Sequence, residues 1–579
     1  MPAGAASYST GIGARLTELP PLRRPAGRQE RERADPAPPA SLGGGATRGS
    51  SVRALIAAAL ALGMGLRLLQ YAAGRSLWLD EALMVPKIVE PSFAGLLSPA
   101  NWSAVPPGFL LLEKLSVALL GNHQYALRLV PLLAGVGSLF LFLAVARRLL
   151  SPPAVPIALI LFALSPFLIY YSSEVKQYSL DVALALGLTW LALELSRRGV
   201  TPLRALLWWA LGIAAALFSM TSVLVAVGAT LALGLARWRS AGGDQSGALA
   251  LVAVLAGWGL SLGAPYLFFL AADGGYTRTF WQSGFMPLPP VSLADLAWFP
   301  DTFLQLFRDP LGVLSDGQSG SGFYQAAAGM TAFTAGGLWM ASRRKLPFWL
   351  LAAPILLTLL ASGLELYPFG GGWISGGRVI LFLVPAFFLI MAEGALQLWR
   401  RLGGWARGLP LAVIALLILP SLAWGLIAVP FPRTEIEPLL AHARANLRPG
   451  DVFYVHYDVR HAFRYHEPRH GLAEAGGRLL TGPCARLEPG RYLAALSPLR
   501  GQPRVWVLFG GGRGARWFDE KGFMLGYLDR LGTRLESRVA AGASLYLYDL
   551  RTVAARPAQP PMRLPVIRAG AQEGCELWN

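Results

Sequence analysis

The residues best suited to chemistry in this chain are an adjacent acidic pair, Asp80 and Glu81, just past the first long apolar run. Carboxylates at a membrane boundary lose part of their hydration, so they are costly and usually functional. Adjacent side chains diverge, so one carboxylate can face a substrate while the other structures the loop. A partly desolvated carboxylate with a raised pKa can accept the proton of a hydroxyl nucleophile. We expect Asp80 and Glu81 to be catalytic, with a solvated interfacial pair or a helix cap as the alternative.

A second set of charged residues lies at other predicted membrane boundaries. Glu174 and Lys176 stand among tyrosines at the end of an apolar run, where the alternative is a tyrosine belt with snorkelling charges. Arg128 and Arg378 lie at outer boundaries, against the positive-inside trend, and a guanidinium can hold a phosphate bidentately. We expect a donor phosphate to be bound among these residues, with Lys87 as a weaker candidate.

Metal and nucleotide signatures are sparse. Five of the six histidines lie between residues 442 and 470, but no HExxH motif and no neighbouring cysteine accompanies them. The sequence contains no GxxxxGK[ST] motif, so it does not indicate a nucleotide-driven pump. We therefore predict no metal site, although a divalent cation as cofactor stays open. Cys484 and Cys575, the two cysteines, allow a disulfide without showing that they are adjacent.

The composition is that of a membrane protein. The 579 residues are 54% hydrophobic and only 15% charged, with a mean hydropathy of +0.46. The net charge of +18 fits basic cytoplasmic loops, so it does not indicate nucleic-acid binding. Residues 1–51 are rich in Arg, Pro, Gly and Ala, and we expect a disordered cytoplasmic tail.

Apolar runs predict the elements that must position these residues. About eleven transmembrane helices are expected: 53–71, 126–146, 153–171, 178–196, two short spans within 203–236, 247–271, 321–342, 347–364, 378–398 and 408–429. The Arg and Lys clusters between them then fall on the cytoplasmic side with the N-terminus, which leaves the C-terminus outside. Residues 107–120 and 293–307 are predicted to be interfacial helices in long outer loops.

The composition changes near residue 430. Charged residues increase, and strand-like segments at 451–457, 504–509 and 544–548 alternate with helical stretches at 435–447 and 518–531. We expect a transmembrane module over 52–429 and a small α/β domain outside the membrane over 430–579. The fold class is thus mainly α and polytopic, with an extracytoplasmic α/β domain.

The chain resembles the GT-C superfamily of membrane glycosyltransferases, specifically glycosyltransferase family 39-like proteins. Protein O-mannosyltransferases and lipid A aminoarabinose transferases are distant relatives. The resemblance covers about 55–200 and rests on an ordered set of motifs: Trp78-x-Asp80-Glu81, Pro106-Pro107, Gly121-x6-Arg128-x2-Pro131 and Ser165-Pro166-x3-Tyr170-Tyr171-x2-Glu174-x-Lys176-x-Tyr178. Tyr367-Pro368-Phe369-Gly370 and Gly377-Arg378 are also similar to bacterial members.

The resemblance implies transfer of a sugar, with inversion, from a polyprenyl-phosphate donor to a glycan, lipid or protein acceptor outside the plasma membrane. It assigns Asp80 as base, Glu81 as its neighbour, Glu174 to the substrate site, and Arg128 and Arg378 to the departing phosphate. Some relatives carry a basic residue after the acidic pair, where this chain has Ala-Leu-Met, so phosphate binding falls to Lys87, Lys176 or either arginine. Alternatives are a flippase of lipid-linked saccharides, although no internal repeat is visible, or a non-catalytic envelope assembly protein.

Overall fold

The computed structural model describes residues 44–98, 105–239, 245–272, 276–312, 321–370, 376–402, 404–511, 519–551 and 575. The chain divides into Met1–Ser51 and Val52–Asn579, and the description below concerns the second unit. Of the predicted tail, residues 1–43 lie outside the described residues.

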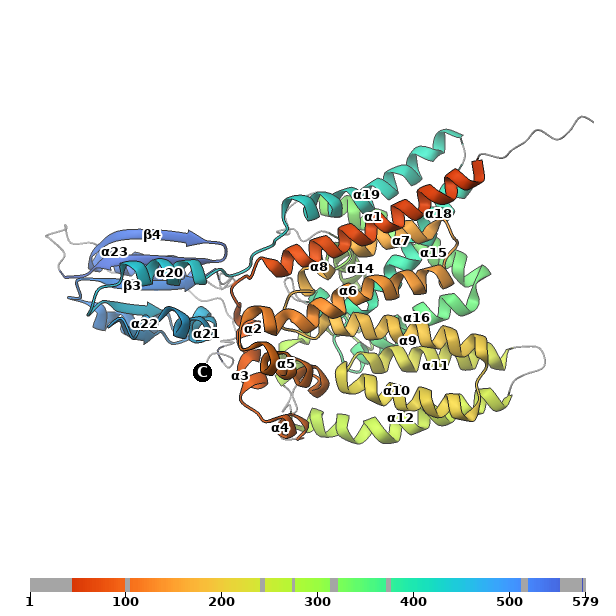
Figure 1. Ribbon diagram of the computed structural model, residues 1–579, viewed down its shortest axis with the longest axis horizontal. Coiled ribbons are helices and arrows are strands. Elements are labelled where there is room, and N and C mark those ends of the chain that lie inside the picture. The colour runs from red at the N-terminus through yellow and green to blue at the C-terminus, as the bar shows by residue number, and fades with distance from the viewer. Residues whose placement is uncertain are drawn as a thin grey trace, which may run out of the picture. The chain divides into compact units, whose positions relative to one another are not determined.

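Long helices form a bundle between residues 52 and 427 (Figure 1). They are α1 (Gly44–Ala72), α6 (Gln124–Leu149), α7 (Ala154–Ala163), α8 (Pro166–Tyr171), α9 (Tyr178–Arg198), α10 (Pro202–Phe218), α11 (Ser222–Trp238), α12 (Gln245–Ala272), α15 (Ser321–Arg343), α16 (Lys345–Gly363), α18 (Val384–Arg401) and α19 (Gly408–Ile427). In the described residues, seven helices are long and apolar enough to cross a membrane, and three more apolar helices are shorter. The multi-pass fold is confirmed, while the count of eleven spans stays a prediction.

Two predicted spans differ from the structure in detail. The run 153–171 is not continuous, because α7 ends at Ala163 and α8 starts at Pro166, after a cap in which the Ser165 hydroxyl accepts from the Leu168 amide. The run 378–398 is continuous only from Val384, after a short helix and a 3-10 turn. Proline has no amide hydrogen to donate, so it suits the first turn of a helix and breaks a longer one.

Short helices fill the loops at one end of the bundle. The first loop holds α2 (Leu79–Ala82), α3 (Met84–Val89), α4 (Phe93–Leu97) and α5 (Pro107–Leu120), and later loops hold α13 (Tyr276–Phe280), α14 (Leu293–Arg308) and α17 (Gly376–Val379). Helices were correctly predicted at 107–120 and, to within a residue, at 293–307. Ser292 and Asp295 begin α14 with a reciprocal capping box, which satisfies amides that have no partner within the helix.

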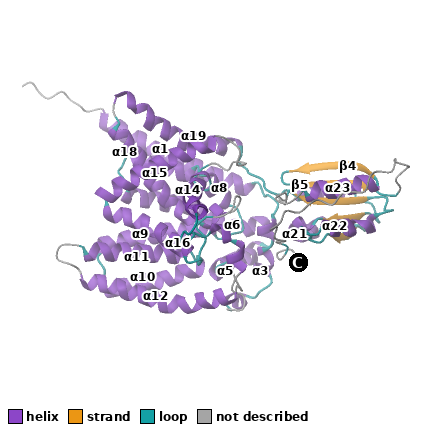
Figure 2. Cartoon of the chain, turned by 180° about the vertical axis from the view of Figure 1, so that it is seen from behind, coloured by secondary structure: helices purple, strands orange, loops and turns teal. Residues whose placement is uncertain are grey.

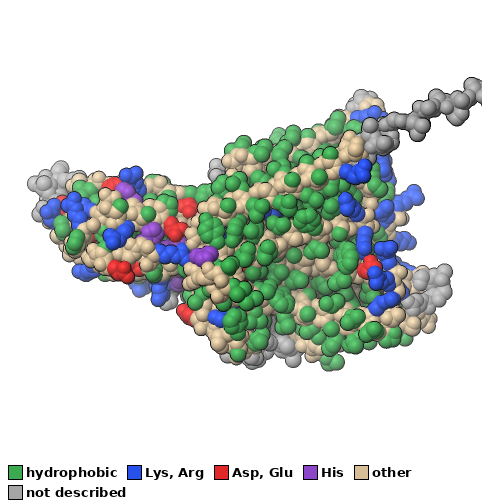
Figure 3. Space-filling view, viewed as in Figure 1, with side chains coloured by type: hydrophobic (Ala, Val, Ile, Leu, Met, Phe, Trp, Pro, Cys, Tyr) green, Lys and Arg blue, Asp and Glu red, His purple; other side chains and the backbone are tan. Residues whose placement is uncertain are grey.

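Basic side chains gather at the opposite end of the bundle from these short helices (Figure 3). Arginines occupy the last turns of α6, α9, α11, α15 and α18. Between the two ends, the visible surface is mainly apolar (Figure 3). This distribution fits a bundle that crosses a membrane with its basic loops on one side.

The C-terminal domain is a five-stranded mixed sheet with helices beside it (Figure 2). Its elements are α20 (Glu437–Asn446), β1 (Val452–Val455), α21 (Arg460–His470), β2 (Arg478–Thr481), α22 (Pro489–Leu496), β3 (Val505–Gly510), α23 (Glu520–Leu531), β4 (Thr533–Ala540) and β5 (Ala543–Asp549). The strand order is β2-β1-β3-β5-β4. β1 pairs with β2 and β3 in parallel, and β5 pairs with β3 and β4 in antiparallel. The predicted α/β class is confirmed.

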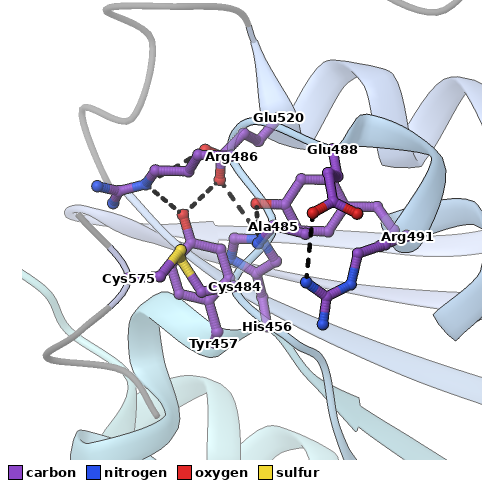
Figure 4. Close-up of a disulfide and its surroundings, with 10 residues drawn as sticks. His456, Tyr457, Cys484, Ala485, Arg486, Glu488, Arg491, Glu520 and Cys575 are labelled. Carbon is purple, nitrogen blue, oxygen red and sulfur yellow. Dashed lines mark hydrogen bonds and ion pairs between the residues drawn. A yellow bond between two sulfur atoms is a disulfide. The ribbon is translucent and has the colours of Figure 1, made fainter. Parts of the chain in front are cut away.

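A disulfide joins Cys484 to Cys575, with their Cα atoms 5.6 Å apart (Figure 4). It lies in the same buried cluster as Tyr457, which follows β1. The Tyr457 hydroxyl donates to Glu520 Oε2 at 2.6 Å and accepts from Arg486 Nε at 2.9 Å. The disulfide that the sequence left open is therefore present, and it ties a distant C-terminal residue to the ends of the parallel strands.

Candidate active site

Asp80 and Arg378 form an ion pair at the end of the bundle that faces the C-terminal domain. Asp80 lies in α2 and Arg378 in α17, and Arg378 Nη1 is 2.5 Å from Asp80 Oδ2. The Asp80 side chain is 20% exposed and that of Arg378 is 9% exposed, so the carboxylate can still be reached by solvent. The Arg378 guanidinium also lies over the ring of Trp281, 5.8 Å from its centroid. Two residues that the sequence predicted separately are thus brought into contact.

The expected raised pKa of Asp80 is wrong for this structure. Burial works to raise this pKa, but the charges of Arg378, Lys176 and Arg433 outweigh burial and hold the pKa of Asp80 below its usual value. The sequence places the carboxylate near a membrane, but it does not show how many cations surround it.

Glu81 and Arg128 form a second, fully buried pair. Arg128 Nε donates to Glu81 Oε1 at 2.8 Å and Nη2 donates to Oε2 at 2.6 Å, with both side chains at most 2% exposed. The amides of Trp78 and Val175 donate to the same carboxylate. Two further donors of Arg128 are occupied, because Nη1 and Nη2 also donate to the carbonyls of Arg75 and Ser76. Both predicted residues are buried against the loop that carries Asp80, and their expected roles at the substrate stay predictions.

Glu174 is fully buried. Its nearest described cation is Arg433, whose Nη1 is 3.9 Å from Glu174 Oε2. Neither carboxylate oxygen has a hydrogen-bond partner among the described residues. Burial raises the pKa of Glu174, and Arg433 opposes that rise only in part.

Arg433 is a site residue that was missed in the sequence. Its guanidinium lies 3.2 Å from the ring centroid of Trp78, and its Nη1 is 3.4 Å from the Tyr170 hydroxyl. It comes from the connection between α19 and α20, well outside the motifs. Arg433 could have been found by the criterion that selected Arg128 and Arg378, because it is also an arginine at an outer membrane boundary, against the positive-inside trend.

Two lysines complete the group. Lys176 is half-buried; burial lowers its pKa, while the charge of Asp80 works to raise it. Lys87, in α3, is exposed and close enough for its charge to lower the pKa of Lys176 further. Cations outnumber carboxylates here: Arg75, Lys87, Arg128, Lys176, Arg378 and Arg433 against Asp80, Glu81 and Glu174. Such an excess favours a bound anion.

Trp281 is followed in the chain by residues that line a pocket of about 320 Å³. It is lined by Gln282, the next residue in the chain, and by apolar side chains that include Leu288 and Trp298. Glu365, at its rim, pairs with Arg278 at 3.1 Å. In the described part of the chain, no three His, Cys, Asp or Glu residues gather closely enough to hold a metal ion.

Comparison with known proteins gives a family match over part of the chain. Residues 104–260 match the family described as dolichyl-phosphate-mannose-protein mannosyltransferase. The match includes Arg128, Glu174 and Lys176, and it stops short of Asp80 and Arg378 on either side. The predicted resemblance to GT-C membrane glycosyltransferases is confirmed. No curated protein matches the chain by sequence.

Several solved structures are similar to this fold. The archaeal oligosaccharyltransferase AglB from Archaeoglobus fulgidus, in complex with an inhibitory peptide and a dolichol-phosphate, is 12% identical over 92% of this chain and 77% of its own, with a TM-score of 0.44. ArnT from Cupriavidus metallidurans, bound to undecaprenyl phosphate, is 12% identical over 86% of this chain and 98% of its own, with a TM-score of 0.44. The mycobacterial arabinofuranosyltransferase AftD is 15% identical over 86% of this chain and 41% of its own, with a TM-score of 0.42.

Proposed function

We propose that this protein is an integral membrane glycosyltransferase. It moves a sugar from a polyprenyl-phosphate donor to a hydroxyl of a glycan, lipid or protein acceptor, with inversion at the anomeric carbon. The observation that carries the proposal is the partly exposed Asp80 carboxylate in contact with Arg378, within a group of residues that has an excess of cations. The family match over residues 104–260 supports the same class of reaction.

The reaction needs a base and a stabilised leaving group. The acceptor oxygen attacks the anomeric carbon as its proton passes to the Asp80 carboxylate. The bond between that carbon and the phosphate oxygen breaks, and its electron pair leaves with the polyprenyl phosphate. Arg378 and Lys176 stabilise the negative charge that develops there. Attack opposite the leaving group inverts the stereochemistry.

The pairing of Asp80 with Arg378 suggests how the donor prepares the base. A phosphate competes with the Asp80 carboxylate for the same guanidinium, because both are oxyanions that bind it strongly. When Arg378 turns to the phosphate, Asp80 loses its closest cation, and its pKa rises toward the range useful for general base catalysis. Donor binding therefore precedes activation of the acceptor.

The remaining candidates take different roles. Glu81 and Arg128 act as a buried support for the loop, since all of their short contacts are to each other and to backbone. Glu174 and Arg433 line the site beneath Trp78, and Lys87 is placed to meet the phosphate from the exposed side. The protein lies in the plasma membrane with its N-terminus in the cytoplasm and its C-terminal domain outside.

The decisive experiment compares Asp80→Asn with the unchanged protein, each full length and in nanodiscs. The substrates are a panel of undecaprenyl-phosphate-linked monosaccharides with envelope extract as acceptor, and the measurement is release of undecaprenyl phosphate. We expect Asp80→Asn to lower turnover by at least about 1,000-fold, within the range by which a positioned base accelerates such a step. Binding of undecaprenyl phosphate should persist.

The matched control is Glu90→Gln, which removes an exposed carboxylate from the same loop. It should leave turnover unchanged. Normal turnover in Asp80→Asn would contradict the transferase proposal. Transbilayer movement of the lipid without sugar transfer would favour the flippase instead.

A further inference from the structure

We propose that the C-terminal domain holds the Asp80 loop in its working geometry, with His466 and Glu435 as positioning residues. The proposal rests on the proposed function, because it takes Asp80 as the base. It gives a role to a domain that otherwise lies beyond the motifs of the transmembrane module.

The loop before Asp80 has no regular secondary structure to pair its backbone amides and carbonyls. The amides of residues 74–78 therefore need partners outside the segment. The Leu77 amide donates to His466 Nε2 at 3.0 Å, from a position that is fully buried. The Ser76 amide donates to Glu435 Oε2 at 3.0 Å. Both acceptors belong to the C-terminal side of the chain, more than 350 residues away in sequence.

A third bond runs in the opposite direction. The Glu437 amide, at the start of α20, donates to the Ser76 hydroxyl at 3.1 Å. Leu77 packs in the same buried cluster as Ile436 and Leu440. The domain therefore forms hydrogen bonds with Ser76 and Leu77, which lie four and three positions before Asp80.

The bundle holds the same two peptide units from their other side. Arg128 donates to the carbonyls of Arg75 and Ser76, at 2.6 Å and 3.2 Å, while Glu81 fixes Arg128. In these two peptide units, the transmembrane module binds the carbonyl oxygens and the C-terminal domain binds the amide hydrogens. A loop held from both sides has little freedom to move the carboxylate.

Histidine suits this position because of its two ring nitrogens. Nε2 accepts from the Leu77 amide, so the ring proton lies on Nδ1, which is 3.2 Å from Glu437 Oε1. The negative charge of this carboxylate favours the tautomer in which Nε2 is the acceptor. His466 itself is fully buried and touches no reacting atom, so its effect passes through the backbone.

The test uses two variants of His466 and one control. His466→Leu removes the acceptor, whereas His466→Gln can restore an acceptor oxygen close to the place of Nε2. His470→Leu is the matched control, because His470 lies one turn further along α21 and, among the described residues, makes no hydrogen bond to the loop. Amide exchange of a peptide containing residues 74–81 is followed by mass spectrometry in the full-length protein, beside turnover of the donor panel described above.

We expect His466→Leu to speed exchange of this peptide at least about tenfold, the effect of losing one buried hydrogen bond. Its kcat should fall by about 10- to 100-fold with KM for the donor little changed, because misplacing a catalytic group affects the chemical step. His466→Gln should recover most of both losses, and His470→Leu should resemble the unchanged protein.

Wild-type exchange at 74–81 in His466→Leu would overturn the inference, and so would faster exchange with unchanged kcat. A loss of kcat that His466→Gln does not recover, with exchange raised across the whole domain, would show a merely structural effect and would also overturn it. These outcomes are separate from failure of the proposed function, which is decided by turnover in Asp80→Asn.

Discussion

At the scale of single residues, the arrangement divides two neighbouring carboxylates between two tasks. Asp80 keeps partial access to solvent and meets Arg378, whereas Glu81 is buried against Arg128. Breaking a buried ion pair costs far more than breaking an exposed one, since it leaves a charge without a partner. In the proposed function, the buried pair therefore supports the loop, and the accessible pair takes part in the reaction.

The balance of charges around Asp80 predicts a shift of the pH profile. In Arg378→Gln, burial still raises the pKa of Asp80, but the largest opposing charge is gone, so the pKa rises. The carboxylate is the active form, and activity falls as the pH drops through its pKa. The acidic limb of kcat/KM should therefore move to higher pH in this variant.

The control for that measurement is Arg278→Gln, which removes an exposed guanidinium paired with Glu365 in the neighbouring loop. Its acidic limb should coincide with that of the unchanged protein. An unmoved limb in Arg378→Gln, measured over the range in which the protein stays folded, would show that this ion pair does not govern the base.

At the scale of elements, the bundle depends on close packing between α15 and α18. A side chain at Gly336 would meet the carbonyl of Ile390, and one at Gly394 would meet the carbonyl of Ala332. Such contacts allow two backbones to approach where larger residues would separate them. α18 follows directly from the segment that carries Arg378, so its position also sets that arginine.

Adjacent glycines in α15 provide a direct comparison. Gly336→Ala should destabilise the protein by about 1–3 kcal/mol, the usual cost of overpacking. Gly337→Ala adds a methyl group with nothing within 4 Å, so it should be neutral or stabilise the helix by up to about 1 kcal/mol. Thermal unfolding in detergent measures both, and equal shifts in the two variants would refute the packing argument.

At the scale of the whole molecule, topology and the disulfide can be tested together. Cys484 and Cys575 are 91 residues apart, and closing a loop of that length stabilises a fold by about 2–5 kcal/mol. A disulfide persists in an oxidising compartment, so the proposed location of the domain outside the cytoplasm predicts that the bond forms in cells.

Protein purified without reductant should carry no free thiol, and dithiothreitol should lower its thermal midpoint. The double variant Cys484→Ser, Cys575→Ser should have the lower midpoint from the start and should not respond to the reductant. Two free thiols in protein alkylated within intact cells would contradict the outward orientation.

The sequence by itself determined most of the elements. Apolar length predicted helices wherever the bundle has them, because a backbone in lipid must satisfy its own hydrogen bonds. It predicted β1, β3 and β5, which are buried and rich in β-branched and aromatic residues, but not β2 or β4. β4 is an edge strand with mostly exposed side chains, so it lacks an apolar signature.

Only the tertiary structure showed where an apolar run is broken into two helices and which charged residues come into contact. The break between α7 and α8 is hidden in a continuous apolar run, and it is accommodated because the buried Arg67 of α1 donates to the free carbonyl of Ala163 at 3.0 Å. Likewise, Asp80 and Arg378 stood out in the sequence as separate boundary charges, 298 residues apart. Their contact, the lowered pKa of Asp80 and the approach of His466 depend on distances in space, because charge and hydrogen bonding act between neighbours that spacing along a chain does not specify.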